Sequence, residues 1–268
     1  MTNPENTPAA HLRRFLSYFL AGADRLVAEL RAPKVPAGRG YTKTASGYFE
    51  LVAGQPPKAL CAALNELAAM QPPGVYLTLN PVNPALLARA NNCLVFASSG
   101  GTTSDADIVG RRWLYIDADP VRPSGISATD EEKASALAVC DAVAEDLRAR
   151  GWPDPARNDS GNGYHLLYRV DLPADDGGLT ERALKALAAK HDTPAAKVDV
   201  SVFNPARIFK LPGTWARVSD CPRGRTVQLY ETKDEADKAR AFIDRHSCGG
   251  ACCRRHRVVY LPEEGGDQ

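Results

Sequence analysis

The chain has 268 residues, is 44% hydrophobic and carries 33 basic against 32 acidic residues, which leaves a formal net charge of +1. This length and apolar content predict one large domain or two smaller lobes around a real core. A net charge near zero excludes a global field that attracts nucleic acid. A polyanionic partner would therefore need a local basic surface, for which the basic stretch 201–230 is a candidate.

Seven cysteines, an odd number scattered along the chain, indicate a reducing, cytoplasmic compartment rather than a secreted disulfide framework. No run approaches the roughly 18 apolar residues that a membrane span needs, so we expect no membrane insertion. The stretch "RRFLSYFLAGA" at 13–23 looks like an export signal that ends in small residues. However, an apolar stripe at helical spacing continues through it from Phe15 to Leu30, which predicts an amphipathic helix within residues 1–31.

Residues 32–110 are expected to form a small N-terminal α/β lobe. Its first part, 32–57, is rich in Pro, Gly and Lys and predicts a connecting segment on the surface. Lys34, Arg39 and Lys43 in this segment could touch a nucleic acid or belong to a solvated loop. The pattern then predicts a helix at 58–70, a strand at 74–80, a short helix at 84–90 and a strand at 93–97.

Residues 111–230 are expected to form a second lobe, followed by a helix and a tail rich in Cys and His at 231–268. The strand "WLYIDADP" at 113–120 precedes a helix that begins at a capping box of Thr129 and Glu132 and stops at Gly151. Further elements are predicted as a strand at 164–170, a helix at 179–191, a strand at 197–203, and the strands "RIFKL" and "TVQLY". This order predicts an α+β fold, a mixed sheet with helices on one face and the other face open.

Two acids at the end of an apolar strand need something to offset their repulsion. Because side chains alternate across a strand, Asp117 and Asp119 should leave one face roughly 6 to 7 Å apart. At an effective dielectric constant near 20 they repel by about 2 to 3 kcal/mol, which a cation, a base or exposure to water would offset. Two further strands hold His165 and Asp199 at apolar positions. Each group alone fits a structural role, but carboxylates on neighbouring strands predict a site for two Mg²⁺ or Mn²⁺ ions.

The loop "DSGNGYH" supplies groups that suit an anion. Gly161 and Gly163 would let the backbone approach a ligand, Ser160 adds a hydroxyl, and His165 is placed to donate. The loop leads into a strand, whereas a Walker loop leads out of one, so a P-loop NTPase is excluded. Downstream of Asp199, the cations of Arg207 and Lys210 suit a triphosphate, and a salt bridge to Asp199 is the structural alternative.

The order Asp-x-Asp at 117 and 119, Ser-Gly-x-Gly-x-His at 160–165 and a flanked Asp at 199 resembles the catalytic half of the archaeo-eukaryotic primase superfamily. The likeness is to the primase-polymerases of phages and mobile elements. It covers roughly residues 74–214 and includes "YLTLNP", "TSDADI", "IDADPVRPSGIS", "SGNGYHLLYRV" and "SVFNPARIFKLPGT". The resemblance implies an RRM-like sheet joined to a smaller N-terminal lobe. It also implies template-directed joining of nucleotides with release of pyrophosphate.

The resemblance also implies roles for individual residues. Asp117, Asp119 and Asp199 would hold two Mg²⁺ or Mn²⁺ ions. The phosphates of an incoming nucleoside triphosphate would be contacted by Ser160, Gly161, Gly163, His165, Arg207 and Lys210. A single-stranded DNA template is the implied partner, and a helicase would be a separate protein because this chain has no Walker motif. Asn80 and Asp105 receive no clear role: they would position nucleotide or template, or brace the lobes.

The tail "HSCGGACCRRH" offers several zinc ligands within eleven residues. His246, Cys248, Cys252, Cys253 and His256 would suit a structural Zn²⁺, although their spacing matches no standard finger. The alternative is free thiols beside a basic patch.

Two other function classes stay open at this stage. A replication-initiator endonuclease would need a paired His motif beside a tyrosine, and the five histidines form no such pair. A non-catalytic RRM-like binder would display exposed aromatic side chains for base stacking, where this chain has Asp and His.

Overall fold

The computed structural model describes residues 8–123, 126–218, 221–230 and 257–260. In this part of the chain, a first sheet has the strand order β4-β2-β1-β3-β9. Its strands are β1 (Arg25–Gly38), β2 (Tyr41–Val52), β3 (Tyr76–Thr78), β4 (Val95–Phe96) and β9 (Ile208–Lys210). All their pairings are antiparallel. The helix α2 (Lys58–Met70) packs its Leu60, Ala63 and Leu67 against this sheet.

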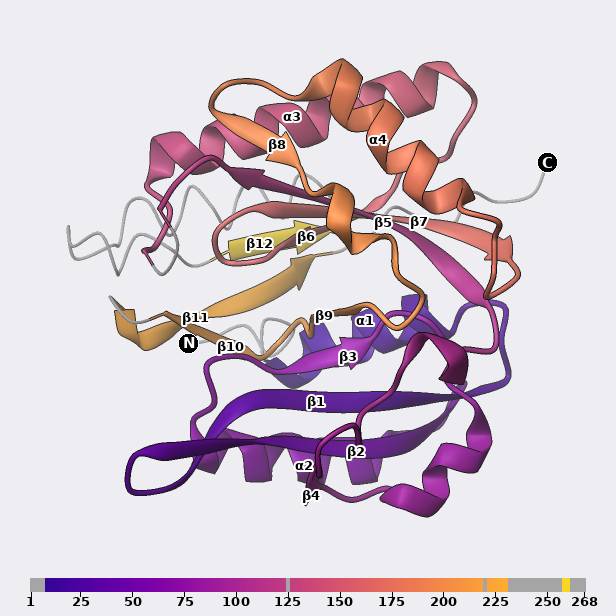
Figure 1. Ribbon diagram of the computed structural model, residues 1–268, viewed down its shortest axis with the longest axis vertical. Coiled ribbons are helices and arrows are strands. Elements are labelled where there is room, and N and C mark those ends of the chain that lie inside the picture. The colour runs from indigo at the N-terminus through magenta and orange to yellow at the C-terminus, as the bar shows by residue number, and fades with distance from the viewer. Residues whose placement is uncertain (1–7, 124–125, 219–220, 231–256, 261–268) are drawn as a thin grey trace.

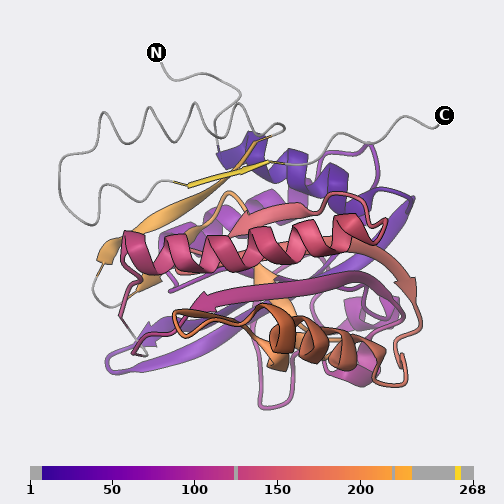
Figure 2. The ribbon, with the colours of Figure 1, turned by 90° about the horizontal axis from the view of Figure 1, so that it is seen from above.

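A second sheet forms the other half of the molecule, in the order β6-β7-β5-β8. Its elements are β5 (Arg111–Pro120), α3 (Asp130–Ala149), β6 (Ala156–Asp159), β7 (Tyr164–Leu172), α4 (Leu179–His191) and β8 (Ala196–Val198). The chain order β-α-β-β-α-β with the first strand beside the third and fourth is the RRM topology. Both helices lie over one face of the sheet (Figures 1 and 2). The predicted α+β class with an RRM-like sheet and helices on one face is confirmed.

The two sheets share one hydrophobic core, with α1 (Pro8–Leu20) between them. The ring of Phe15 lies 5.1 Å from Phe209 in the first sheet, and Phe19 stacks on Trp113 in the second at 6.2 Å. The second sheet is therefore open only in part on the face away from α3 and α4. The helix α1 covers the end that holds Trp113, and the end that holds the acids stays uncovered.

Shorter elements complete the described chain. They are the 3₁₀ turns η2 (Pro84–Arg89), η3 (Asp105–Asp107) and η4 (Val200–Phe203), and a small sheet of β10 (Trp215–Val218), β11 (Cys221–Tyr230) and β12 (Arg257–Tyr260). The pair β11 and β12 is parallel. Within the described ranges, no helix is both long enough and apolar enough to cross a membrane.

Several predicted elements are confirmed. The helices at 58–70 and 179–191 have the expected bounds. The capping box of α3 is present: Thr129 Oγ1 accepts a hydrogen bond from Glu132 N at 3.1 Å, and Glu132 Oε2 accepts one from Thr129 N at 2.8 Å.

The prediction for the N-terminal region is wrong beyond Leu20. The helix ends there, Gly22 adopts a φ of +67°, and the apolar run that follows is strand β1. Residues 26–30 are buried on both faces of that strand, so the apolar residues of this run imitate a helical stripe. The expected connecting segment at 32–57 is likewise wrong, because most of it forms the hairpin of β1 and β2.

Three further differences concern the C-terminal half. The predicted strand at 197–203 ends at Val198, and Asp199 instead caps the turn η4 by accepting from Ser201 N at 2.8 Å. Strand β9, expected in the second lobe, pairs with β3 in the first sheet. The predicted helix after residue 230 and the zinc candidates His246, Cys248, Cys252, Cys253 and His256 lie outside the described residues.

Candidate functional site

A cavity of about 470 Å³ lies between the two sheets, at the end of the second sheet that α1 leaves uncovered. Its polar lining consists of Tyr76, Tyr115, Asp117, Asp119, Arg122, Ser160, Asn162, His165, Asp199, Arg207 and Lys210. Its remaining lining consists of Pro33, Val202, Ile208 and Phe209. The structure thus brings together, in one cavity, seven of the nine residues predicted for the site, and the other two, Gly161 and Gly163, belong to the loop that contains Ser160.

The acids reach the cavity from one edge of the second sheet. Asp117 and Asp119 leave the same face of β5, as alternation predicts. The backbone N–H of Asp199 donates to Asp117 O at 2.7 Å, just past the end of β8. The three carboxylates therefore come from two adjacent strands, although Asp199 lies on a turn rather than within a strand.

The carboxylate of Asp117 is only partly satisfied by the protein. Tyr115 donates its hydroxyl to Asp117 Oδ2 at 3.2 Å. The other oxygen, Oδ1, is buried and accepts no hydrogen bond, although His165 Nε2 lies 3.4 Å away. A buried carboxylate oxygen without a hydrogen bond is costly, so this atom is suited to a cation.

Burial and mutual repulsion make both acids of β5 weak. Burial, followed by repulsion from Asp199, raises the pKa of Asp117 to about 7. Burial and repulsion from Asp117 raise the pKa of Asp119 to about 6. Each shift means that the negative charge is destabilised in this cavity, and a positive ligand would relieve it. Raised carboxyl pKa values of this kind are concentrated at functional sites.

His165 faces Asp117 across the pairing of β5 and β7 and is 3% exposed. Its Nδ1 lies 3.0 Å from Asn158 Nδ2 on β6. Burial lowers the pKa of His165 to about 3, so the imidazole is neutral near pH 7. With the Asn158 amide donating to Nδ1, the single ring proton sits on Nε2, on the side of the acids. Asn158 is a functional neighbour that the sequence pattern did not single out.

The loop from Ser160 to Gly163 is held mainly by its own hydrogen bonds. Ser160 Oγ accepts from Gly163 N at 2.9 Å and donates to Gly163 O at 3.2 Å. Asp159 Oδ1 accepts from Gly161 N at 2.9 Å, and its other oxygen forms a buried ion pair with Lys133 Nζ at 2.7 Å. Neither Lys133 nor Asp159 was predicted, because their partnership spans β6 and α3.

The absence of a side chain at Gly163 lets its loop lie close to strand β5. A Cβ placed on Gly163 would lie 2.2 Å from Asp119 Oδ1 and 2.4 Å from Ala118 O. The glycine that was expected to admit a ligand therefore admits the carboxylate of Asp119, and this contact sets the spacing between the loop and β5.

The positive groups enter from the opposite side. Lys210, on β9 of the first sheet, donates to Ser160 O at 2.7 Å and so joins the two sheets across the cavity. Burial lowers its pKa. Arg207 Nη2 donates to Ser201 O at 2.6 Å, while its Nε is buried without a hydrogen-bond partner. Arg122, which was not predicted, also lines the cavity and leaves its Nε without a partner.

The carboxylates of the cavity fit one manner of metal binding. Among the described residues, no three His, Cys, Asp or Glu side chains form a group that could hold a metal ion by themselves. Mg²⁺ does not require such a group, since it commonly binds one or two carboxylates together with water and substrate phosphates. Asp117 and Asp119, with an oxygen that lacks a hydrogen bond and raised pKa values, fit that manner of binding.

The aromatic side chains of the open sheet face are not available for base stacking. Trp113 and Tyr115 are 4% and 5% exposed, because α1 and the first sheet cover them. An RRM-type binder uses exposed aromatics on this face. The face instead presents Asp117, Asp119 and His165 to the cavity.

Comparison with known proteins gives a distant likeness among solved structures. No protein-family model matches the chain, and no curated protein matches it. Among solved structures, the chain is similar to the polymerase domain of Ligase D from Mycobacterium tuberculosis in complex with DNA, with a TM-score of 0.39 and 15% sequence identity. The similarity covers 81% of this chain and 79% of that chain. A likeness this distant says nothing about the reaction, which has to follow from the cavity.

Proposed function

We propose that this protein is a template-directed nucleotidyltransferase, a primase or DNA polymerase that joins nucleotides and releases pyrophosphate. The observation that supports this is a single cavity of about 470 Å³ lined by the carboxylates of Asp117, Asp119 and Asp199 and by the cations of Arg122, Arg207 and Lys210. That size is within the range of small-molecule sites. A nucleoside triphosphate with its metal ions has a matching distribution of charge, since its phosphates need cations on every side.

In this proposal, Asp117 and Asp119 would hold Mg²⁺ or Mn²⁺, with Asp199 beside them. Bound cations would activate the attacking 3′-hydroxyl and neutralise charge on the leaving pyrophosphate, with two ions as the full complement. The carboxylates would fix that charge next to the phosphates. Repulsion between the acids, which raises the pKa values in the free protein, favours cation uptake.

The opposite wall would bind the triphosphate. Arg207 and Lys210 supply charge, and the neutral His165 can donate one hydrogen bond from Nε2. Ser160, which lines the cavity, would lie near the phosphates, while Gly161 and Gly163 shape the loop that carries it. In the reaction the 3′-oxygen bonds to the α-phosphorus, the bond to the β-phosphate breaks, and pyrophosphate leaves.

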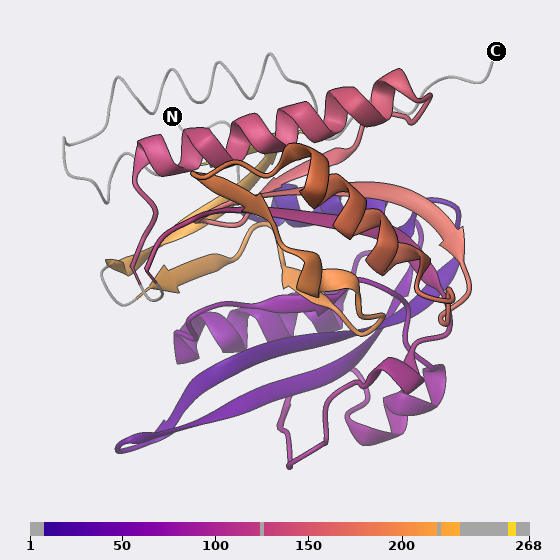
Figure 3. The same cartoon turned by 45° about the horizontal axis from the view of Figure 1, so that its top comes forward.

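The substrate partners would be nucleoside triphosphates and single-stranded DNA, with any helicase a separate protein. We place the template on the hairpin of β1 and β2, which projects from the first sheet (Figure 3). Residues 32–49 contain three cations, Lys34, Arg39 and Lys43, and no acid. All three are exposed, as are the rings of Tyr41 and Phe96, with Lys43 Nζ 5.5 Å from the centre of the Phe96 ring. Cations interleaved with exposed rings suit single strands.

The test is a synthesis assay on single-stranded templates, with and without a primer, comparing ribo- and deoxynucleotides in Mg²⁺ and in Mn²⁺. Replacing both Asp117 and Asp119 by Asn keeps their shape and removes their charge. We expect synthesis to fall by about a thousandfold or more, with unchanged circular dichroism. Wild-type protein that binds single strands but makes no product would favour the non-catalytic binder instead, and full synthesis by the double variant would reject the proposed site.

A further inference from the structure

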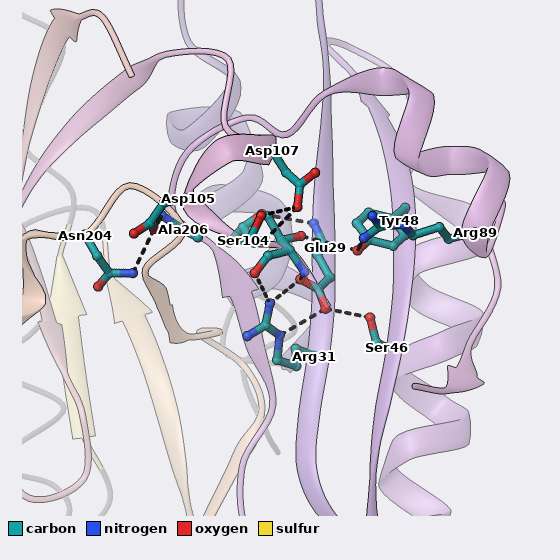
Figure 4. Close-up of polar contacts among 12 residues, drawn as sticks. Glu29, Arg31, Ser46, Tyr48, Arg89, Ser104, Asp105, Asp107, Asn204 and Ala206 are labelled. Carbon is teal, nitrogen blue, oxygen red and sulfur yellow. Dashed lines mark hydrogen bonds and ion pairs between the residues drawn. The ribbon is translucent and has the colours of Figure 1, made fainter. Parts of the chain in front are cut away.

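The motif "TSDADI" lies outside the cavity, yet it is tied to the segment that carries Arg207. Asp105, the first residue of η3, accepts two hydrogen bonds through Oδ1 (Figure 4). The donors are Ala206 N at 2.9 Å and Asn204 Nδ2 at 3.3 Å. These contacts join parts of the chain that are about a hundred residues apart, and they end one residue before Arg207.

Other groups hold the same segment along its whole length. Asn80 Nδ2 donates to Pro205 O at 2.9 Å, and Leu79 N donates to Arg207 O at 2.8 Å, both from the end of β3. From the second sheet, Arg111 Nη1 donates to Phe203 O at 2.7 Å. The segment 203–207 is therefore bound at every residue, and Asp105 is its acidic partner.

Asp105 is itself held firmly in the first lobe. The preceding Thr103 donates its backbone N–H to Glu29 Oε2 at 3.0 Å, and Glu29 is fully buried and bound by Arg31 (Figure 4). On the other side, Asp107 Oδ2 accepts from Ser104 N at 2.8 Å and from Ser104 Oγ at 2.7 Å. The position of the Asp105 carboxylate is thus fixed by the first lobe.

We infer that Asp105 is a positioning residue for triphosphate binding: it sets the place of the Arg207 guanidinium by holding Asn204 and Ala206. This inference rests on the proposed function. Arg207 reaches the cavity with Nε lacking a partner, and among the described residues its side chain donates one hydrogen bond, to Ser201 O in the neighbouring turn η4. The backbone at 204–206 therefore largely determines where that side chain lies. Without the Asp105 carboxylate, the segment loses two hydrogen bonds to the first lobe, those donated by Asn204 and Ala206.

The experiment compares Asp105→Ala with Asp105→Asn in the full chain, using steady-state synthesis and binding of a fluorescent nucleoside triphosphate. The amide oxygen of Asn can still accept from Ala206 N, whereas Ala cannot. We expect Asp105→Ala to raise KM and the Kd for the nucleotide about tenfold with a smaller change in kcat. Asp105→Asn should remain within about twofold of wild type. Glu145→Ala, which removes an exposed carboxylate on α3 away from this segment, is the control and should change neither constant.

A double-mutant cycle with Arg207→Ala separates positioning from general bracing. If Asp105 acts through Arg207, adding Asp105→Ala to Arg207→Ala should weaken nucleotide binding no further. Independent, multiplying effects would overturn the inference, as would wild-type binding by Asp105→Ala. Wild-type protein that binds no triphosphate would overturn the proposed function and this inference together, whereas loss of the positioning effect alone would leave the proposed function standing.

Discussion

At the scale of single residues, the acids of β5 carry a cost that the fold tolerates. Their pKa values of about 7 and about 6 exceed the usual value near 4, so the folded protein holds protons that the unfolded chain releases. Stability of the metal-free protein must therefore fall as the pH rises from about 4 to about 7. Buried acids that lower the stability of the fold in this way are typical of functional sites.

Replacing Asp117 by Asn should weaken this dependence of stability on pH. The neutral amide keeps an acceptor for the Tyr115 hydroxyl and abolishes the repulsion. At pH 8 without metal we expect the free energy of unfolding to rise by about 2 kcal/mol, and at pH 5 by only about a third of that, because the unfolded carboxyl is already ionised there while the folded one is still protonated. Millimolar Mg²⁺ should raise the melting temperature of the wild type at pH 8 and leave that of Asp117→Asn nearly unchanged. Urea titrations at both pH values check this, and a wild-type stability that does not vary with pH would contradict it.

The residues of the site could be found from the sequence because each interrupts an apolar strand. Asp117, Asp119 and His165 stand at positions where burial normally selects hydrophobic side chains. Asn158, Lys133 and Arg122 give no such signal: Asn158 lies among other polar residues in the short strand β6, and polar residues are ordinary in a helix such as α3 and in the loop that holds Arg122. Their roles follow only from strand pairing and from the packing of α3, which no local pattern contains.

At the scale of elements, the loop before β7 depends on one missing side chain. A methyl group on Gly163 would meet Asp119 Oδ1 and Ala118 O, and main chain cannot move aside as a flexible side chain can. The start of β7 would have to shift, and with it His165 two residues later.

Gly163→Ala is therefore expected to lower the free energy of unfolding by about 1 to 3 kcal/mol and to reduce synthesis further than the lost stability explains. Gly110→Ala is the matched control, because its new Cβ would lie 3.6 Å from the nearest atom, Leu172 O, an ordinary contact. Thermal unfolding of the two variants decides the matter. Equal stability of the two variants would mean that the loop before β7 accommodates the added methyl group without strain.

Elements with local signals were predicted well, and those that depend on partners were not. The capping box marks the start of α3 and Gly151 marks its end, so the bounds of this helix follow from the sequence. The hairpin of β1 and β2 was missed because Pro33 and Pro36 look like loop residues. Within β1, Leu30 and Arg31 are the described residues that pair with β3. On that side, the residues of β1 after Arg31 lie at an edge of the sheet, where proline is tolerated.

The scale of the whole molecule explains why the cavity lies where it does. Neither sheet contains a complete site: the acids and His165 belong to the second sheet, and Lys210 belongs to the first. Three connections hold the two sheets together around the cavity: α1 in the shared core, the segment 203–207, and the hydrogen bond from Lys210 to Ser160 O. The sequence could suggest two lobes but not that β9 returns to the first, because pairing across the chain leaves no local trace.

The same arrangement predicts where charge is needed outside the cavity. The molecule has almost no net charge, so template binding has to depend on a local surface, and we propose residues 32–49 of the β1–β2 hairpin, which contain three cations and no acid. Changing Lys34, Arg39 and Lys43 together to Gln should weaken binding of single-stranded DNA about tenfold or more at moderate salt. The slope of log affinity against log salt should fall by about 2, since each lost phosphate contact removes about 0.7.

Neutralising three cations on the helical face is the control for that experiment. Arg150, Lys185 and Lys190 all form exposed ion pairs on α3 or α4, on the far side of the second sheet from the hairpin (Figure 1). Changing them to Gln removes the same total charge from the molecule. If the template follows the hairpin, this second variant keeps the wild-type salt slope, because net charge as such contributes little at a distance beyond the Debye length. Equal losses of affinity in the two triple variants would mean that binding responds to net charge and not to the position of the cations. The proposed path of the template along the hairpin would then be wrong.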